Sequence, residues 1–102
     1  MNVNISDKEL LKLYTTGKSK KLKYSKDIIE KFIMRVQTII SSVNIHDFWK
    51  DPAINFEKLQ GYDNRYSMKL NNKYRLEMEI DWENKEKTMG TFYIKEISTH
   101  YQ

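Results

Sequence analysis

The chain has 102 residues, 39% of them hydrophobic, which suits one domain with a modest core better than a disordered segment. It contains no cysteine and two histidines, so disulfides, thiolate chemistry and a structural zinc site are not expected. The formal net charge of +4 is typical of a solubilising surface, or of a protein with an anionic partner such as nucleic acid or an acidic protein. We expect a single domain over residues 1–102.

No apolar run approaches the length of a membrane span, and the N-terminus lacks the apolar region of a secretory signal. These two features predict a cytoplasmic protein without membrane association.

Residues 2–5 alternate in polarity and predict a short first strand. Ser6 and Glu9 have the spacing of a capping box at a helix N-terminus. Apolar residues then follow at helical spacing, and Gly17 is a plausible stop. We therefore predict a first helix over residues 7–15.

Residues 18–26 (KSKKLKYSK) hold five lysines and no acid. Such a run is typical of a solvated loop, and it would also fit a phosphate backbone or an acidic partner.

The clearest helical pattern in the chain follows this loop. Ser25 can cap the helix, and Asp27 is favourable in its first turn. We expect the apolar face of this helix to cover the sheet. Its apolar residues recur at helical spacing: Ile28, Ile29, Phe32, Ile33, Val36, Ile39, Ile40 and Val43.

Residues 44–52 predict a short helical turn in which Phe48 and Trp49 close the edge of the core. His46 fits a surface or capping histidine better than a catalyst. Residues 53–58 then lead into a hairpin.

The hairpin consists of two alternating strands around the polar residues 71–73. A three-residue loop pairs Leu70 with Tyr74 and Met68 with Leu76, whereas a two-residue loop would mix charged and apolar residues on both faces. We predict the three-residue loop, with asparagine as a suitable left-handed residue at its bulge. The polar face then carries Lys69, Arg75, Glu77 and Glu79.

Residues 89–98 predict a last strand with Phe92 and Ile94 facing the core. Ile97 falls out of phase, which indicates a bulge or the end of the strand. The order is β-α-α-β-β-β. It predicts an α+β fold in which two N-terminal helices pack on one face of a small, twisted antiparallel sheet.

A polar sheet face with cations, next to a C-terminal histidine and tyrosine, is compatible with metal-free RNA cleavage. The 2′-hydroxyl is the nucleophile, and the reaction needs a base, an acid and a cation for the negative phosphorane. His100 suits proton transfer near neutral pH, and Arg75 suits the phosphate. The alternatives are a frayed terminal histidine and an arginine paired with a glutamate across strands.

A family resemblance supports the cleavage hypothesis. Leu59-x-Gly61 and residues 65–76 (RYSMKLNNKYRL) resemble the "L-x-G … W-S-V-R-V-N-G-x-(Y/W)-R-I" block of the HigB toxins. These toxins belong to the RelE/ParE superfamily of type II toxin–antitoxin systems. Residues 94–101 (IKEISTHY) also resemble the C-terminal strand and histidine of the family. The element order and the length are similar too.

The resemblance implies a metal-independent, ribosome-dependent mRNA endonuclease that cuts the codon in the A site and needs no cofactor. It also implies binding to the 70S ribosome and mRNA. A HigA-type antitoxin with a helix-turn-helix domain would neutralise the toxin in a hetero-oligomer.

Carried over by position, Arg75 matches the arginine that contacts the phosphate, and His100 matches the catalytic histidine. Some members have a second histidine before the L-x-G block, where Glu57 offers an alternative base. Others end in Asp-Tyr-His, where this chain has Ser-Thr-His, and Tyr101 is a candidate for the role of that tyrosine. The residues predicted to contact RNA are Arg65, Lys69, Lys58, Lys73 and Lys95.

Two other functions remain open from the sequence. A ParE-like relative would inhibit DNA gyrase and would lack the catalytic histidine, so His100 favours the nuclease. The other is a non-catalytic protein-binding module, in which the basic loop and the polar sheet face dock an acidic partner.

Overall fold

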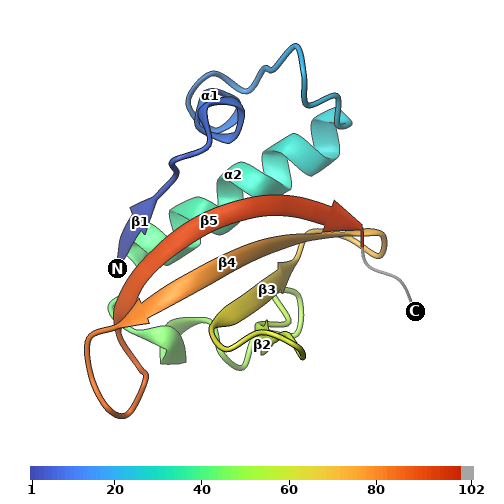
Figure 1. The fold of residues 1–102 in the computed structure, drawn as a ribbon. Coiled ribbons are helices and arrows are strands. Elements are labelled where there is room, and N and C mark those ends of the chain that lie inside the picture. The colour runs from blue at the N-terminus through green and yellow to red at the C-terminus, as the bar shows by residue number, and fades with distance from the viewer. Residues whose placement is uncertain (100–102) are drawn as a thin grey trace.

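The computed structural model describes residues 1–99, which form two α-helices and one five-stranded sheet (Figure 1). The strand order in the sheet is β1-β5-β4-β3-β2. In chain order the elements are β1 (Asn2–Asn4), α1 (Lys8–Thr16), α2 (Lys26–Ser41), the 3-10 turn η1 (Ile45–Asp47), β2 (Glu57–Lys58), β3 (Arg65–Lys69), β4 (Tyr74–Trp82) and β5 (Gly90–Thr99).

The α+β class is confirmed, and the predicted order β-α-α-β-β-β is found with β2 as an additional short strand, but the prediction of an antiparallel sheet is wrong at one edge. β1 lies parallel to β5, with Val3 opposite Phe92, while the other neighbouring strands are antiparallel. In the sequence, both helices lie between β1 and the other four strands. A long helical connection lets the chain return to the same side and run parallel to its first strand. The sheet is therefore mixed.

The core lies between α2 and the apolar face of the sheet, and α2 runs along and behind β5 in Figure 1. Phe32 and Ile39 of α2 are fully buried, as are Leu76 and Met78 of β4. α1 packs beside α2, where Tyr14 meets Phe32 edge to face with the ring centroids 6.4 Å apart. Because the helices cover this face, the polar face of β3, β4 and β5 has no helix above it.

The cap of α1 differs from the predicted one. The carboxylate of Asp7, not the hydroxyl of Ser6, accepts hydrogen bonds from the N–H groups of Glu9 at 2.9 Å and Leu10 at 3.0 Å. The negative charge of aspartate also favours a helix N-terminus, which a neutral serine cannot match. The predicted stop is confirmed, because Gly17 has a left-handed φ of 74° and its N–H bonds back to the last turn.

Ser25 caps α2 as predicted, and its hydroxyl accepts from the N–H of Ile28 at 3.3 Å. The predicted apolar face is too long, since Ile40 is 49% exposed and Val43 is 69% exposed. Ile40 lies about 100° around the helix from the buried Ile39. Val43 lies beyond the end of α2.

Arg35 is a buried cation on α2 that the apolar pattern did not predict. Its Nε donates to the Lys69 carbonyl at 2.9 Å, and its Nη2 donates to the Ala53 carbonyl at 3.1 Å. Burial lowers the pKa of Arg35, and the charge of Asp51 opposes this shift. The guanidinium thus joins α2 to the end of β3 and to the chain before β2.

The predicted hairpin register is confirmed: Met68 lies opposite Leu76, and the Leu70 N–H donates to the Tyr74 carbonyl at 3.0 Å. The prediction of a left-handed asparagine in this turn is wrong. The described non-glycine residues with positive φ are Asn55 and Lys87, and neither lies in the turn.

The side chain of Asn71 shapes the turn instead. Its Oδ1 accepts from the N–H groups of Lys73 at 2.8 Å and Tyr74 at 2.7 Å. An asparagine that bonds to the backbone two and three residues later closes the turn without the left-handed region.

A register shift in β5 confirms the predicted irregularity near Ile97. Ile94 pairs with Met78 and Glu96 pairs with Glu77, so Lys95 is the extra residue. The bulge returns Ile97 to the core face, where it is 8% exposed.

The segment before the hairpin is only partly as expected. Phe48 closes the core at 1% exposure, but Trp49 is 48% exposed and meets Phe56 edge to face. His46 is exposed after the N-cap of η1, as predicted. The following chain adds the short edge strand β2, which was expected only as a connection.

Candidate functional site

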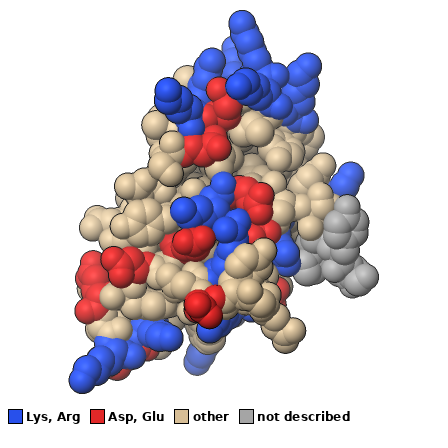
Figure 2. Space-filling view, viewed as in Figure 1, with Lys and Arg blue, Asp and Glu red and all other residues tan. Residues whose placement is uncertain are grey.

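The face of the sheet that no helix covers carries charged side chains from three strands. Figure 2 shows Lys/Arg and Asp/Glu side by side at its centre. The alternation that buries Met68 and Leu76 on one face places their charged neighbours on the other. The polar residues at the centre of this face include Arg65, Ser67 and Lys69 on β3, Arg75, Glu77 and Glu79 on β4, and Glu96 and Ser98 on β5.

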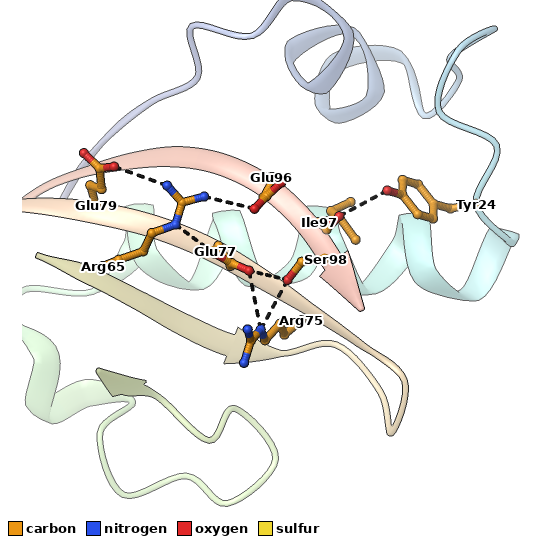
Figure 3. A network of polar contacts seen from close by, with 8 residues as sticks. All are labelled: Tyr24, Arg65, Arg75, Glu77, Glu79, Glu96, Ile97 and Ser98. Carbon is orange, nitrogen blue, oxygen red and sulfur yellow. Dashed lines mark hydrogen bonds and ion pairs between the residues drawn. The ribbon is translucent and has the colours of Figure 1, made fainter. Parts of the chain in front are cut away.

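Arg65 is bound by three carboxylates (Figure 3). Its Nε lies 2.7 Å from Glu77 Oε1, its Nη1 lies 3.3 Å from Glu79 Oε2, and its Nη2 lies 3.1 Å from Glu96 Oε1. Burial by itself lowers the pKa of Arg65, but the hydrogen bond to Glu77 and the charges of all three carboxylates outweigh it, so the pKa is raised. Arg65 therefore cross-links β3, β4 and β5, with its charge compensated by protein groups.

Glu77 is the buried centre of this network, with 5% of its side chain exposed. Besides Arg65, it accepts a hydrogen bond from the Ser98 hydroxyl and lies 3.5 Å from Arg75 Nε. Burial raises its pKa, but the hydrogen bonds from Ser98 and Arg65 and the charges of Arg65 and Arg75 more than offset this, and the pKa is lowered. Glu77 is therefore held as a carboxylate.

Arg75 is positioned by this carboxylate and by Ser98. Its Nε donates to Ser98 Oγ at 3.2 Å, next to the 3.5 Å approach to Glu77. A guanidinium held on its Nε side has a restricted orientation, which matters for a planar group that recognises anions through directed hydrogen bonds.

A pocket of about 160 Å³ lies beside Arg75, at the turn end of the hairpin. It contains two cations, Arg75 and Lys69, which lie opposite each other on β4 and β3. It also contains one carboxylate, that of Glu57 on β2, which lies opposite Ser67 of β3. The remaining lining residues are polar or aromatic: Asn55, Ser67, Asn71, Asn72 and Tyr74.

A second, more open hollow of about 350 Å³ lies on the other side of the hairpin turn and shares Lys69, Asn71 and Asn72 with the first. Arg35 contributes to its wall, but two carbonyl groups already occupy that guanidinium. Lys31 adds an ammonium group from α2. We place the candidate site in the first pocket, where the orientation of the arginine is set by its partners.

The structure brings together three of the residues predicted for the site: Arg75, Lys69 and Glu57. Arg65 shares their face of the sheet but lies in the carboxylate network. His100 and Tyr101 fall outside the residues that the structure describes.

Three predicted RNA-contacting lysines do not line the pocket. Lys58 pairs with Tyr66, whose side chain belongs to the opposite, core face of the sheet. Lys73 lies in the turn with its Nζ 5.3 Å from the centre of the Tyr74 ring. Lys95 is the exposed bulge residue of β5.

The chemistry of the pocket is that of an anion site with a carboxylate at its rim. Arg75 and Lys69 provide positive charge where a phosphate would sit, and oriented cations of this kind also stabilise charge that develops during phosphoryl transfer. Glu57 is exposed and accepts protons when ionised, so it is suited to act as a base.

The analysis of the sequence missed several residues that shape the site. Alternation had placed Glu77 and Ser67 on the polar face without indicating that Glu77 is buried and organises two arginines. Ser98 carried no signal, because its role depends on pairing opposite Arg75. Asn55 comes from the connection before β2. It has a left-handed φ of 46°, a conformation that asparagine adopts more readily than most residues.

Comparison of the chain with protein-family models and with curated proteins gives no match in either case. In residues 1–99, no helix is both long and apolar enough to cross a membrane. Within the same range, no three His, Asp or Glu side chains are grouped so that they could hold a metal ion.

Proposed function

We propose that this protein is the toxin of a type II toxin–antitoxin system, a HigB-like member of the RelE/ParE superfamily that cleaves mRNA in the ribosomal A site. The observation that carries the proposal is the pocket in which Arg75, held by Ser98 and Glu77, meets Lys69 and Glu57. The two helices below a sheet with an open polar face are compatible with this class. The motif resemblance around residues 59–76 supports it further.

In the proposed reaction, the 2′-hydroxyl of one nucleotide attacks the adjacent phosphorus, and the 5′-oxygen of the next nucleotide leaves. Arg75 donates hydrogen bonds to the phosphate oxygens, and Lys69 adds a second positive charge. His100 transfers protons, and Glu57 or Tyr101 supplies the second acid/base group. β5 ends at Thr99, which pairs with Tyr74 at the pocket, and His100 is the next residue in the sequence.

The remaining cations have different roles in this proposal. Arg65 sets the shape of the polar face through its three carboxylates. Lys58, Lys73 and Lys95 are exposed and contribute to contacts with the phosphate backbone of RNA outside the pocket. The partners are the 70S ribosome with its mRNA and a HigA-type helix-turn-helix antitoxin.

The test is cleavage of mRNA on programmed ribosomes, with the message ends mapped by primer extension. We expect cuts within the A-site codon, and we expect Arg75→Ala and His100→Ala each to reduce cleavage by about 100-fold or more, the scale for losing one transition-state donor or one proton-transfer group. Lys87→Ala is the control, because this exposed lysine lies in the turn between β4 and β5, away from the pocket.

The outcomes of this assay separate the alternatives. Cleavage that persists in His100→Ala would assign proton transfer to Glu57 or Tyr101. Absence of cleavage with or without ribosomes would contradict the nuclease, and inhibition of gyrase supercoiling in that case would establish a ParE-like activity. If neither activity is found, a non-catalytic binding module is the remaining function.

A further inference from the structure

The loop between α1 and α2 carries the excess positive charge of the protein. We define the lysine loop as residues 18–26, which include Lys26, the first residue of α2. Its five lysines are all exposed. Without them the chain has 13 Lys and Arg against 14 Asp and Glu, a formal net charge of −1. Figure 2 shows Lys and Arg side chains gathered at the top of the molecule, over this loop. The basic character of the protein is therefore concentrated in one segment.

The backbone of the lysine loop is held in place by the residues between the lysines. The Ser19 hydroxyl donates to Glu9 Oε1 at 2.9 Å and accepts from the N–H groups of Lys21 at 3.2 Å and Leu22 at 3.0 Å. Leu22 is partly buried against the core. A loop that is already ordered loses less conformational entropy when it binds a partner.

Tyr24 connects the lysine loop to the candidate site. Its hydroxyl donates to the Ile97 carbonyl of β5 at 3.3 Å (Figure 3). Its ring meets the Tyr74 ring edge to face, with the centroids 5.5 Å apart. Tyr74 lines the pocket that contains Arg75 and Lys69. Tyr24, near the end of the loop, therefore packs against a residue that lines the pocket, and both tyrosines are partly exposed.

The lysines of the loop form no ion pair within the part of the chain that the structure describes. In the described part of the chain, the ion pairs all belong to Arg65 or Arg75, and none involves a lysine of the loop. Glu9, the acid that contacts the loop, bonds to the Ser19 hydroxyl. Among residues 1–99 the ammonium groups of the loop are thus not engaged in ion pairs. Ammonium groups bind phosphates as point charges without regard to base sequence.

We propose that the lysine loop binds the phosphate backbone of a single-stranded RNA whose neighbouring nucleotide occupies the Arg75 pocket. Continuity with the pocket through Tyr24 and Tyr74 favours a single strand, because aromatic rings between cationic positions suit bases that are free to stack. The choice of RNA rests on the proposed function.

The test measures binding of a short oligouridine by fluorescence anisotropy over a series of salt concentrations. Its 2′-hydroxyls are methylated, so that it has no nucleophile and cannot be cleaved. K20Q/K21Q/K23Q should bind at least ten-fold more weakly at about 0.1 M salt. The negative slope of log K against log salt should become less steep by about 2, since each phosphate contact to a single strand contributes about 0.7. K20R/K21R/K23R keeps the charge and should retain the wild-type slope.

K50Q/K85Q/K87Q is the matched control, because it removes the same charge from exposed lysines of the turn that follows η1 and of the β4–β5 turn. An equal loss in both triple variants would show that only net charge matters and would overturn the proposal. So would an unchanged affinity in K20Q/K21Q/K23Q, or equally tight and equally lysine-dependent binding of double-stranded RNA.

The binding test and the cleavage test fail separately. Loop-dependent binding without cleavage on ribosomes would overturn only the nuclease. Cleavage with an affinity that does not depend on the loop would overturn only the lysine loop as an RNA-binding surface.

Discussion

At the scale of single residues, the side chain with the largest influence on the polar face is Glu77. It is 4% exposed, yet its carboxylate contacts both Arg65 and Arg75 and also accepts a hydrogen bond from Ser98. A buried carboxylate is stable only when hydrogen bonds and opposite charges replace the lost water. The arrangement makes the positions of Arg65 and Arg75 depend on one ionised group.

Glu77→Gln should destabilise the protein by about 2 kcal/mol at neutral pH, because it removes charged hydrogen bonds at a buried position. The pKa of Glu77 is lowered in the folded state, so its contribution is fully present above its unfolded pKa of about 4.3 and is lost as the pH falls through the lower folded value. Urea unfolding at neutral and acidic pH should show the difference between wild type and variant shrinking on acidification.

Glu83→Gln serves as a control for this experiment, since Glu83 is exposed in the β4–β5 turn, away from the network. A wild-type advantage over Glu77→Gln that stays constant down to about pH 2 would contradict the assignment, because a carboxylate contribution must vanish once the group is protonated.

At the scale of elements, local rules predicted both ends of α1, the start of α2 and the hairpin to within a residue or two. The α1 cap shows the limit of such rules. Ser6 and Asp7 are both good N-cap residues, and the capping-box spacing favoured Ser6, whereas the backbone places Asp7 at the cap. Which of two adjacent candidates caps the helix depends on where the chain leaves the preceding strand, and the local sequence pattern does not indicate that position.

Asp7→Ala should therefore reduce the free energy of unfolding by about 1 kcal/mol, because the N–H groups of Glu9 and Leu10 lose their acceptor. Ser6→Ala should change it by less than about 0.5 kcal/mol, as is usual for exposed surface positions. Chemical denaturation of the two variants measures both values, and a larger loss in Ser6→Ala would contradict the observed cap.

At the scale of the whole molecule, one face of the sheet makes the core and the other carries the candidate site. Leu76 and Arg75 are neighbours on β4, but Leu76 is fully buried against the helices and Arg75 lines the pocket. The stability of the fold and the geometry of the site therefore depend on the same strand register.

Leu76→Ala should cost about 2–5 kcal/mol, the range for truncating a buried leucine. Leu76→Asp should prevent folding, because it places an unpaired charge in a core whose total stability is about 5–15 kcal/mol. Leu11→Asp is the control, since Leu11 of α1 is 44% exposed. Circular dichroism during thermal unfolding distinguishes them, and a cooperative transition in Leu76→Asp would contradict the predicted loss of folding.

The sequence by itself determined most of the residues that face the core, the extent of α1 to within a residue, the start of α2, and the register of the β3–β4 hairpin. These features follow from neighbours in the chain, because helical and strand periodicity and turn length act over a few residues. The sequence also marked Arg75, Lys69 and Glu57 as site candidates, through alternation and a family motif.

Only the tertiary structure decided the rest. The parallel pairing of β1 with β5, the burial of Arg35 and the three carboxylates on Arg65 each join segments that are far apart in the chain. The same is true of the pocket, which needs β2 beside β3, and of Tyr24 against Tyr74. Such contacts depend on how whole elements pack, and the charge of a side chain does not indicate which distant partner will compensate it.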